Sequence, residues 1–415
     1  MAFDCFMELG YLLEDNTWFE NIKLIKPSSI LEFDIKNKTL EQNYYWTYSE
    51  IKQQKISFED AVDKLSKLFV KSIKKRYNPK KEICVPISGG LDSRMIAASF
   101  DKIKPTPNLN FVTFGQENCF DFEASDIIAK KMKQKHKFFI LDNEDVIDSR
   151  KYLLWEVDGL FSIMHMHGMN NKDDDFHKNI EVVFSGGIGG EVFGCTYKPK
   201  DGEWNKIPNK NSYSNIYKKQ INNIDLNMEY YNIEQYHPNV ITNALRKFTF
   251  ASLQYSMRNY ELCLPFLDND MIEFIFSIDE SYRKDYNLYF NALKKAFPYF
   301  YSIIPLQRRI GCIKESFIQK ISREIKNKIN DIKHIKQQNH FFDYNEYIKK
   351  TEIQNKILKI LNTENKFLSD NNLDFIKQYM DSYYDIIKFH PDSILKLVSV
   401  KLYFDILSEK LNNRS

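Results

Sequence analysis

The chain has 415 residues, of which 43% are hydrophobic and 15% aromatic, so it can bury a sizeable core and is neither disordered nor of low complexity. Its 59 Lys and Arg residues nearly balance its 56 Asp and Glu residues, and a net charge of +3 lacks the basic footprint of a dedicated nucleic-acid binder. The cysteines form no CxxC pair, and neither a basic leader nor a long apolar run occurs. We therefore expect a cytoplasmic protein with small-molecule partners, without nucleic-acid or membrane partners.

Residues 1–50 predict a small β-rich element. Two partly alternating segments, ILEFDI and LEQNYY, flank Lys36-Asn37-Lys38, which is typical of a β-hairpin. From Phe58 onward, apolar residues recur at helical spacing through FEDAVDKLSKLFVKSIKKRY. This pattern predicts a helix that leads into the main domain.

Between residues 83 and 141, short apolar runs alternate with helical patterns, in the order ICVPI, SRMIAASF, NFVTF, DFEASDIIAKKMKQK and KFFIL. This β-α-β-α-β order predicts an α/β fold, with a parallel sheet and helices on both faces. In such sheets, ligands bind beyond the carboxyl ends of the strands. We therefore expect a ligand site in the loops after residues 87, 114 and 184.

Residues 316–415 are expected to form a helical C-terminal extension. The stretch from 315 to 365 contains no Gly or Pro and predicts exposed helices, whose lysines face solvent rather than bind anions. Earlier in the chain, His165 and His167 stand two residues apart in IMHMHG, so they would point to different faces of a helix. We interpret them as structural residues rather than a metal-binding pair.

The most informative stretch is a glycine-rich loop that follows an apolar strand and opens a helix. Its glycines allow close approach of the backbone to an anion, and the helix N-terminus supplies unpaired N–H groups, so it predicts a phosphate cradle. It lacks the Lys-Ser/Thr ending of a Walker A loop, which argues against kinase or GTPase chemistry. Asp92 offers a carboxylate to Mg²⁺. The structural alternative is a plain glycine turn in which Asp92 is an ordinary N-cap of the following helix. The predicted binding residues here are Ser88, Gly89, Gly90, Leu91, Asp92, Ser93 and Arg94.

Three stretches together resemble one family. SGGLDSR looks like the pyrophosphate loop of the AMP-forming ATP pyrophosphatases, and most of all that of the asparagine synthetase-like amide ligases. FSGGIGGEVFG, at residues 184–194, is similar to the second glycine-rich loop of asparagine synthetases. LPFLD, at residues 264–268, resembles their V-P-F-L-D signature, in which we expect Asp268 to act as a helix cap. The resemblance covers roughly residues 15–315.

The resemblance implies an adenine nucleotide alpha hydrolase-like synthetase domain over residues 51–315, preceded by a remnant of a glutaminase domain. It implies ATP and Mg²⁺ as cofactors, with ATP bound by the first loop and by Ser185, Gly186 and Gly187. A carboxylate would attack the α-phosphorus of ATP, pyrophosphate would leave into the first loop, and ammonia or an amine would attack the acyl-adenylate. Arg309, or failing it Lys314, would steady the phosphoryl charge, with an ordinary surface charge run as the alternative.

The sequence also departs from the family pattern. Residue 2 is Ala, where glutamine-hydrolysing members carry Cys, so we expect nitrogen to come from ammonia, a substrate amine or a separate glutaminase subunit. Gly187 and Gly190 stand where these synthetases usually carry acids, whereas Glu191 remains as an expected catalytic carboxylate. Three functions stay open: an amide ligase for a small-molecule or peptide carboxylate such as aspartate, a cyclase of the β-lactam synthetase or lasso-peptide type, and a degenerate ATP-binding regulator.

Overall fold

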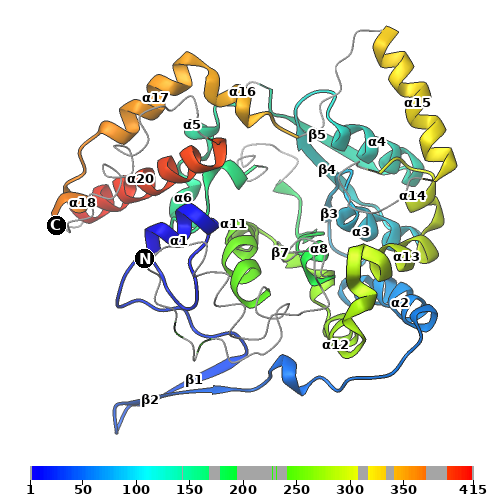
Figure 1. Ribbon diagram of the computed structural model, residues 1–415, viewed down its shortest axis with the longest axis horizontal. Helices are drawn as coiled ribbons and strands as arrows, with labels where there is room; N and C mark the ends of the chain where they lie inside the picture. Colours follow the sequence, from blue (N-terminus) through cyan, green and yellow to red (C-terminus); the bar gives the residue numbers. More distant parts are fainter. Residues whose placement is uncertain are drawn as a thin grey trace.

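The computed structural model describes residues 2–142, 144–167, 178–193, 227, 230, 241–306, 316–332, 341–370 and 390–413. At its centre is a five-stranded sheet with the order β5-β4-β3-β6-β7 (Figure 1). Each neighbouring pair of strands is parallel, which confirms the predicted α/β class. The strands are β3 (Ile83–Pro86), β4 (Asn110–Gly115), β5 (Lys135–Ile140), β6 (Val182–Phe184) and β7 (Glu261–Cys263).

Amphipathic helices flank this sheet, and together they form what we call the sheet body. The helix α2 (Phe58–Arg76) starts as predicted, because Ser57 caps it by accepting a hydrogen bond from the Asp60 N–H. Its apolar face, which includes Leu65 and Phe69, is buried in the core of this body. The other helices here are α3 (Asp92–Asp101), α4 (Phe120–Met132), α8 (Gly189–Val192), α12 (Asn269–Ser277), α13 (Asn287–Ala296) and α14 (Pro298–Ser302).

The direction in which the chain adds new strands to the sheet changes at β3, in the centre of the sheet. From β3 the chain adds β4 and β5 on one side, and then β6 and β7 on the other. In open α/β sheets this reversal is the place where ligands bind. The first glycine-rich loop follows β3 and the second follows β6, so the fold places both loops at the reversal.

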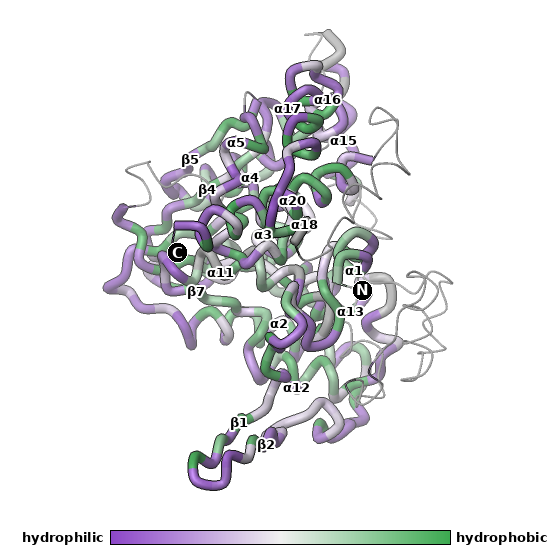
Figure 2. The backbone as a smooth tube through the Cα atoms, turned by 90° about the vertical axis from the view of Figure 1, so that its left-hand side faces the viewer, coloured by the Kyte–Doolittle hydropathy of each residue, from purple (hydrophilic) through white to green (hydrophobic). Residues whose placement is uncertain are grey.

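The chain begins with a helix rather than with the β element that we expected there. In α1 (Ala2–Leu9), Phe3, Phe6 and Met7 fall at helical spacing and are buried. The predicted hairpin follows as β1 (Ser29–Asp34) and β2 (Thr39–Tyr44), which pair antiparallel. It extends away from the rest of the molecule (Figure 2), and large apolar side chains such as Phe33 stay exposed on it.

A second apolar core holds the two ends of the chain together, and we call this part the helical body. The helix α1 lies beside α20 (Pro391–Asn412) in Figure 1. Side chains from α1, from residues 141–166 and from α20 form this core. The C-terminal region is helical, as expected, but α1 and the middle of the chain complete its core. Its other helices are α5 (Val146–Arg150), α6 (Leu153–Glu156), α16 (Tyr344–Lys349), α17 (Thr351–Asn362) and α18 (Lys366–Asp370).

The remaining elements are short turns and two further helices. They are the 3₁₀ turns at Tyr48–Glu50, Ile163–His165, Pro265–Leu267 and Glu280–Tyr286, a π-helical turn at Ile241–Thr249, α11 (Phe250–Asn259) and α15 (Phe317–Ile332). Most described side chains of α15 are exposed, as predicted, whereas α16 and α17 bury one face each in the helical body. Within the described ranges, no helix combines the length and the apolar character that crossing a membrane requires.

Candidate active site

The first glycine-rich loop is fixed by hydrogen bonds from its backbone to nearby side chains. The Ser88 N–H donates to Ser93 Oγ at 3.0 Å, and the Gly90 N–H donates to Ser88 Oγ at 3.2 Å. The Gly89 N–H reaches outside the loop and donates to Asp121 Oδ1 at 2.7 Å. The loop therefore forms a tight, preformed turn at the N-terminus of α3, where helix N–H groups favour an anion.

The second loop lies directly against the first. A Cβ atom added at Gly186 would stand 2.6 Å from the backbone nitrogen of Ser93, and one added at Gly189 would stand 2.6 Å from Asp92 Cγ. Real Cβ atoms do not approach other atoms so closely, so only glycine fits at these two positions. The glycines of FSGGIGGE therefore allow two loops, about 100 residues apart in sequence, to share one site.

Asp92 lies at the junction of the loops, and both of its carboxylate oxygens accept hydrogen bonds. The Gly190 N–H donates to Oδ2 at 2.9 Å, and the Tyr289 hydroxyl donates to Oδ1 at 2.6 Å. Burial raises the pKa of Asp92 to about 6, although the two hydrogen bonds act in the opposite direction. Its carboxylate is thus held in one orientation, in surroundings that disfavour its charge.

Glu191 brings a second carboxylate to the same place. Its pKa is raised to about 7, first by burial and then by the negative charge of Asp92. A cation between two such groups would relieve both effects. Mg²⁺ is commonly bound by one or two carboxylates together with substrate phosphates and water. Asp92 fits that requirement, although the described residues contain no cluster of three or more metal-binding side chains.

Arg94, predicted to bind ATP, has its side chain directed into the protein instead. It is fully buried, and its guanidinium donates to the carbonyls of Gly89 at 3.0 Å, Phe300 at 2.9 Å and Pro305 at 2.8 Å. Burial lowers its pKa to about 10. The Leu91 side chain is buried as well, and its carbonyl accepts a hydrogen bond from Tyr301 at 2.7 Å. These two residues support the loop, and only their backbone could contact a ligand.

The other predicted residues have mixed outcomes. Ser185 and Gly187 belong to the second loop, where the Gly187 N–H donates to Ser185 Oγ at 3.1 Å. Asp268 caps α12 as expected, by accepting a hydrogen bond from the Asp270 N–H at 3.2 Å. Arg309 and Lys314 lie outside the described residues.

The two histidines of IMHMHG form no metal-binding pair. His165 Nε2 lies 3.4 Å from Asp392 Oδ1, whereas the buried ring of His167 packs 4.8 Å from Phe114 and 4.4 Å from Phe341. Burial lowers the pKa of His167 to about 3, so it is neutral at ordinary pH. The two histidines therefore contact different parts of the protein, His165 an aspartate and His167 two phenylalanine rings.

Sequence reasoning missed two residues of the site. Asp121 begins α4 after strand β4, at the sheet edge where ligands are expected, so the strand order offered a signal for it. Tyr289 lies on α13, almost 200 residues beyond Asp92, and no motif marks it. Its ring is stacked on Phe193 with a centroid distance of 4.3 Å and an interplanar angle of 6°.

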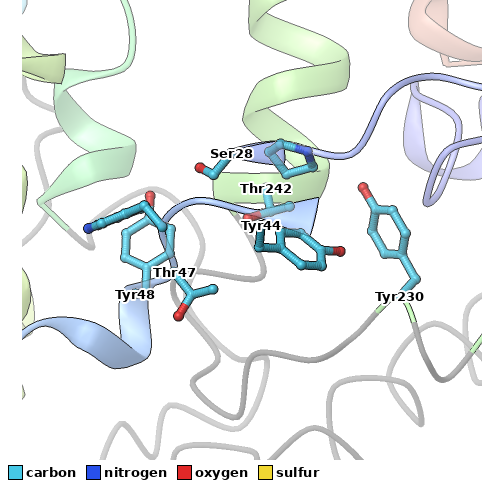
Figure 3. Close-up of a pocket in the computed structure, with 8 residues that line it drawn as sticks. Ser28, Tyr44, Thr47, Tyr48, Tyr230 and Thr242 are labelled. Carbon is cyan, nitrogen blue, oxygen red and sulfur yellow. The ribbon is translucent and has the colours of Figure 1, made fainter. Parts of the chain in front are cut away.

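An aromatic pocket at the base of the hairpin lies outside this site (Figure 3). It has no lining residue in common with the two glycine-rich loops. The lining residues are Pro27, Ser28, Tyr44, Trp46, Thr47, Tyr48, Tyr230 and Thr242.

Comparison with known proteins places the site within a matched segment. A family model described as asparagine synthase matches residues 64–305, which include both loops, Asp121 and Tyr289. A Methanocaldococcus jannaschii protein, provisionally named asparagine synthetase (glutamine-hydrolyzing) 2, is 24% identical over 200 residues, covering 46% of this chain and 38% of that protein. Asparagine synthetase (glutamine-hydrolyzing) 3 of Bacillus subtilis is 24% identical over 193 residues, covering 42% and 31%. The chain thus spans well under half the length of these relatives.

Proposed function

The chain belongs to the asparagine synthase family, and from that premise we propose that it is an ATP-dependent, AMP-forming carbon–nitrogen ligase. A substrate carboxylate attacks the α-phosphorus of ATP, the bond from that phosphorus to the bridging oxygen breaks, and pyrophosphate leaves. Ammonia or an amine then attacks the carbonyl carbon of the acyl-adenylate and loses a proton. AMP departs, and an amide remains.

The packing of the two glycine-rich loops at the N-terminus of α3 carries this proposal. Gly186 and Gly189 bring the second loop within contact distance of Ser93 and Asp92. Helix N-termini and glycine-rich turns bind phosphate groups through backbone N–H donors. The hydroxyls of Ser88 and Ser93 are 3.1 Å apart and can turn toward a ligand. This arrangement supports binding of the leaving pyrophosphate by residues 88–93 and of ATP by residues 185–187.

The two carboxylates have different roles in this proposal. Asp92 would hold Mg²⁺, which when bound neutralises charge on the phosphates of ATP. Glu191, the second buried carboxylate of the site, would accept the proton that the attacking amine releases. We assign the cation that steadies the phosphoryl group to Arg309, with Lys314 as second choice.

The substrates follow from the same chemistry. The activated group would be a small-molecule or peptide carboxylate, with aspartate as the first candidate. Nitrogen would come from ammonia, from an amine of the substrate or from a separate glutaminase subunit. Intramolecular amide closure, which uses an amine of the substrate and needs no glutaminase, is the rival reaction.

Nucleotide products give the direct test. The protein would be incubated with Mg-ATP, a panel of carboxylates that includes aspartate, and either ammonium salts or amines. We expect AMP and pyrophosphate to form in equal amounts, and only when a carboxylate is present. ADP and phosphate as the sole products would contradict the proposal. Asparagine formed from aspartate and ammonium would favour the amidating reaction over ring closure.

A further inference from the structure

We propose that Tyr289 is a positioning residue, whose hydroxyl fixes the Asp92 carboxylate for the divalent cation that accompanies ATP. This inference rests on the proposed function for the identity of the ligand. The hydrogen bond itself does not depend on it, because the Tyr289 hydroxyl lies 2.6 Å from Asp92 Oδ1. Asp92 opens α3, and the Gly190 N–H and the Tyr289 hydroxyl, which donate to its carboxylate, both lie outside that helix.

The bonding pattern at Asp92 suits a carboxylate that must still bind a ligand. Tyr289 donates to one carboxylate oxygen and the Gly190 N–H donates to the other, at 2.9 Å. Two donors on two oxygens fix the plane of the group. A carboxylate has about four lone-pair sites, so each oxygen can still accept one further partner, such as a cation.

Aromatic packing fixes the donor as well. The side chain of Tyr289 is buried, with an exposed fraction of 1%. Its ring is stacked on Phe193 at 4.3 Å and meets Phe69 at 5.9 Å and Phe266 at 6.1 Å, edge to face. Such pairs have defined geometry, so the hydroxyl is delivered from a nearly immobile ring.

The two glycine-rich loops and the LPFLD motif all contact Tyr289. Asp92 belongs to the first loop, Phe193 follows Glu191 in the second, and Phe266 belongs to LPFLD. The ring that supports Tyr289 is therefore part of the segment that carries Glu191. Packing alone would be satisfied by phenylalanine at this position. A buried hydroxyl is costly without a partner, so the contact with Asp92 is the feature that tyrosine adds.

Tyr289→Phe tests the proposal, because it removes the hydroxyl and keeps the ring. ATP binding would be measured by calorimetry, once with MnCl₂ and once with EDTA. We expect the Kd for ATP to rise about tenfold with Mn²⁺ and to change less than about twofold with EDTA. The variant lacks the hydrogen bond under both conditions, but the orientation of Asp92 affects ATP binding only when Asp92 holds a metal ion. Equal changes in Kd with MnCl₂ and with EDTA would overturn the proposal, because they would indicate general damage to the site and not a loss of metal binding.

Tyr347→Phe is the matched control. Its hydroxyl also donates to an aspartate, Asp145 Oδ1 at 3.1 Å, but in the helical body. It should leave ATP binding unchanged with either MnCl₂ or EDTA. In the double variant with Asp92→Asn, Tyr289→Phe should add nothing to the loss caused by Asp92→Asn alone, whereas independent effects would add and would contradict the coupling.

A titration with MnCl₂ alone, followed by electron paramagnetic resonance, separates this proposal from the proposed function. If the unmodified protein binds Mn²⁺ but not ATP, the ligase proposal fails, and the positioning role still requires weaker Mn²⁺ binding by Tyr289→Phe. Mn²⁺ binding that is equal in both proteins, or absent from both, overturns the positioning role.

Discussion

The glycine-rich loops of the sheet body and the core of the helical body hold buried charge in opposite ways. In the sheet body, burial raises the pKa of Asp92 to about 6 and that of Glu191 to about 7. In the helical body, burial also acts to raise the pKa of Asp392, but hydrogen bonds from His165 and Lys396 outweigh it and bring the value to about 2. At Asp392 the hydrogen-bonding partners dominate the pKa, whereas at Asp92 and Glu191 burial dominates it.

The two fully buried arginines repeat this contrast. Arg150 forms an ion pair with Glu144, with Nη2 2.7 Å from Oε2, and this pair outweighs burial and raises the pKa of Arg150. Arg94 donates to backbone carbonyls, and burial lowers its pKa to about 10. Groups whose pKa is shifted mainly by burial gather at the loops, as is common at functional sites. The paired groups stabilise the fold.

The largest effect should come from removing a paired charge. Arg150→Met leaves Glu144 buried without its cation, so we expect unfolding free energy to fall by about 3 to 5 kcal/mol. Arg94→Met leaves only neutral carbonyls without donors and should cost about 1 to 3 kcal/mol. Urea unfolding of both variants measures the difference. Equal losses would mean that the two bodies do not differ in how they hold charge.

Asp92→Asn should lower AMP-forming turnover about 10²-fold or more while the protein stays folded, because a metal-binding carboxylate is lost. Asp145→Asn is the matched substitution in the helical body, where Asp145 pairs with Lys356. It should leave turnover unchanged and cost at most about 1 kcal/mol of stability. Turnover assays and thermal unfolding distinguish these effects. Retained turnover in Asp92→Asn would remove Asp92 from the site.

The carboxylates of Glu191 and Asp392 should also respond to pH with opposite signs. Glu191 keeps its proton in the folded state up to a pH of about 7, so it lowers stability as pH rises above about 4. Glu191→Gln should therefore be more stable than the natural protein by about 1 to 2 kcal/mol at pH 8, with no difference near pH 4.

Asp392 gives the reverse case, because its pKa lies below its ordinary value. Its contribution is present above a pH of about 4 and is lost as pH falls toward 2. Asp392→Asn should be destabilising at pH 7 and neutral at pH 2. Unfolding free energies of both variants at each pH give the test, and a response of the same sign in both would contradict the contrast.

Removing a neutral hydrogen bond should have the smallest effect on stability, and this effect should be the same in the two bodies. Tyr301→Phe removes the bond to the Leu91 carbonyl, and Ser399→Ala removes the acceptor of the Ile163 N–H. Each should cost about 1 kcal/mol, because both are neutral bonds between buried groups. Chemical unfolding of the two variants provides the measurement. A large difference between them would show that packing, rather than charge, separates the two bodies.

The elements with strong periodicity were predictable from sequence. The β-α-β-α-β pattern predicted the parallel sheet, and SGGLDSR and FSGGIGGE were expected at strand ends, where the structure places them. The buried direction of Arg94 was not predictable, because its carbonyl partners at Phe300 and Pro305 lie more than 200 residues away. Local patterns carry no signal for such partners.

The start of the chain and Tyr289 show two other limits. Apolar residues at 3, 6 and 7 fit a helix, but their burial depends on α20, at the opposite end of the sequence. Tyr289 reads as one more apolar residue of an amphipathic helix, and its role follows only from the position of Asp92. The sequence predicts which loops matter better than it predicts which side chains support them.

Gly187 differs from the other glycines of its loop in the room that surrounds it. A Cβ atom there would meet Ser185 Oγ at 3.3 Å and Leu253 Cδ1 at 4.0 Å, whereas the positions of Gly186 and Gly189 are closed by contacts at 2.6 Å. A small rotation of the Ser185 hydroxyl would admit a side chain. Position 187 is therefore where a saturation library can introduce acids, amides or hydroxyls without rebuilding the contact between the loops.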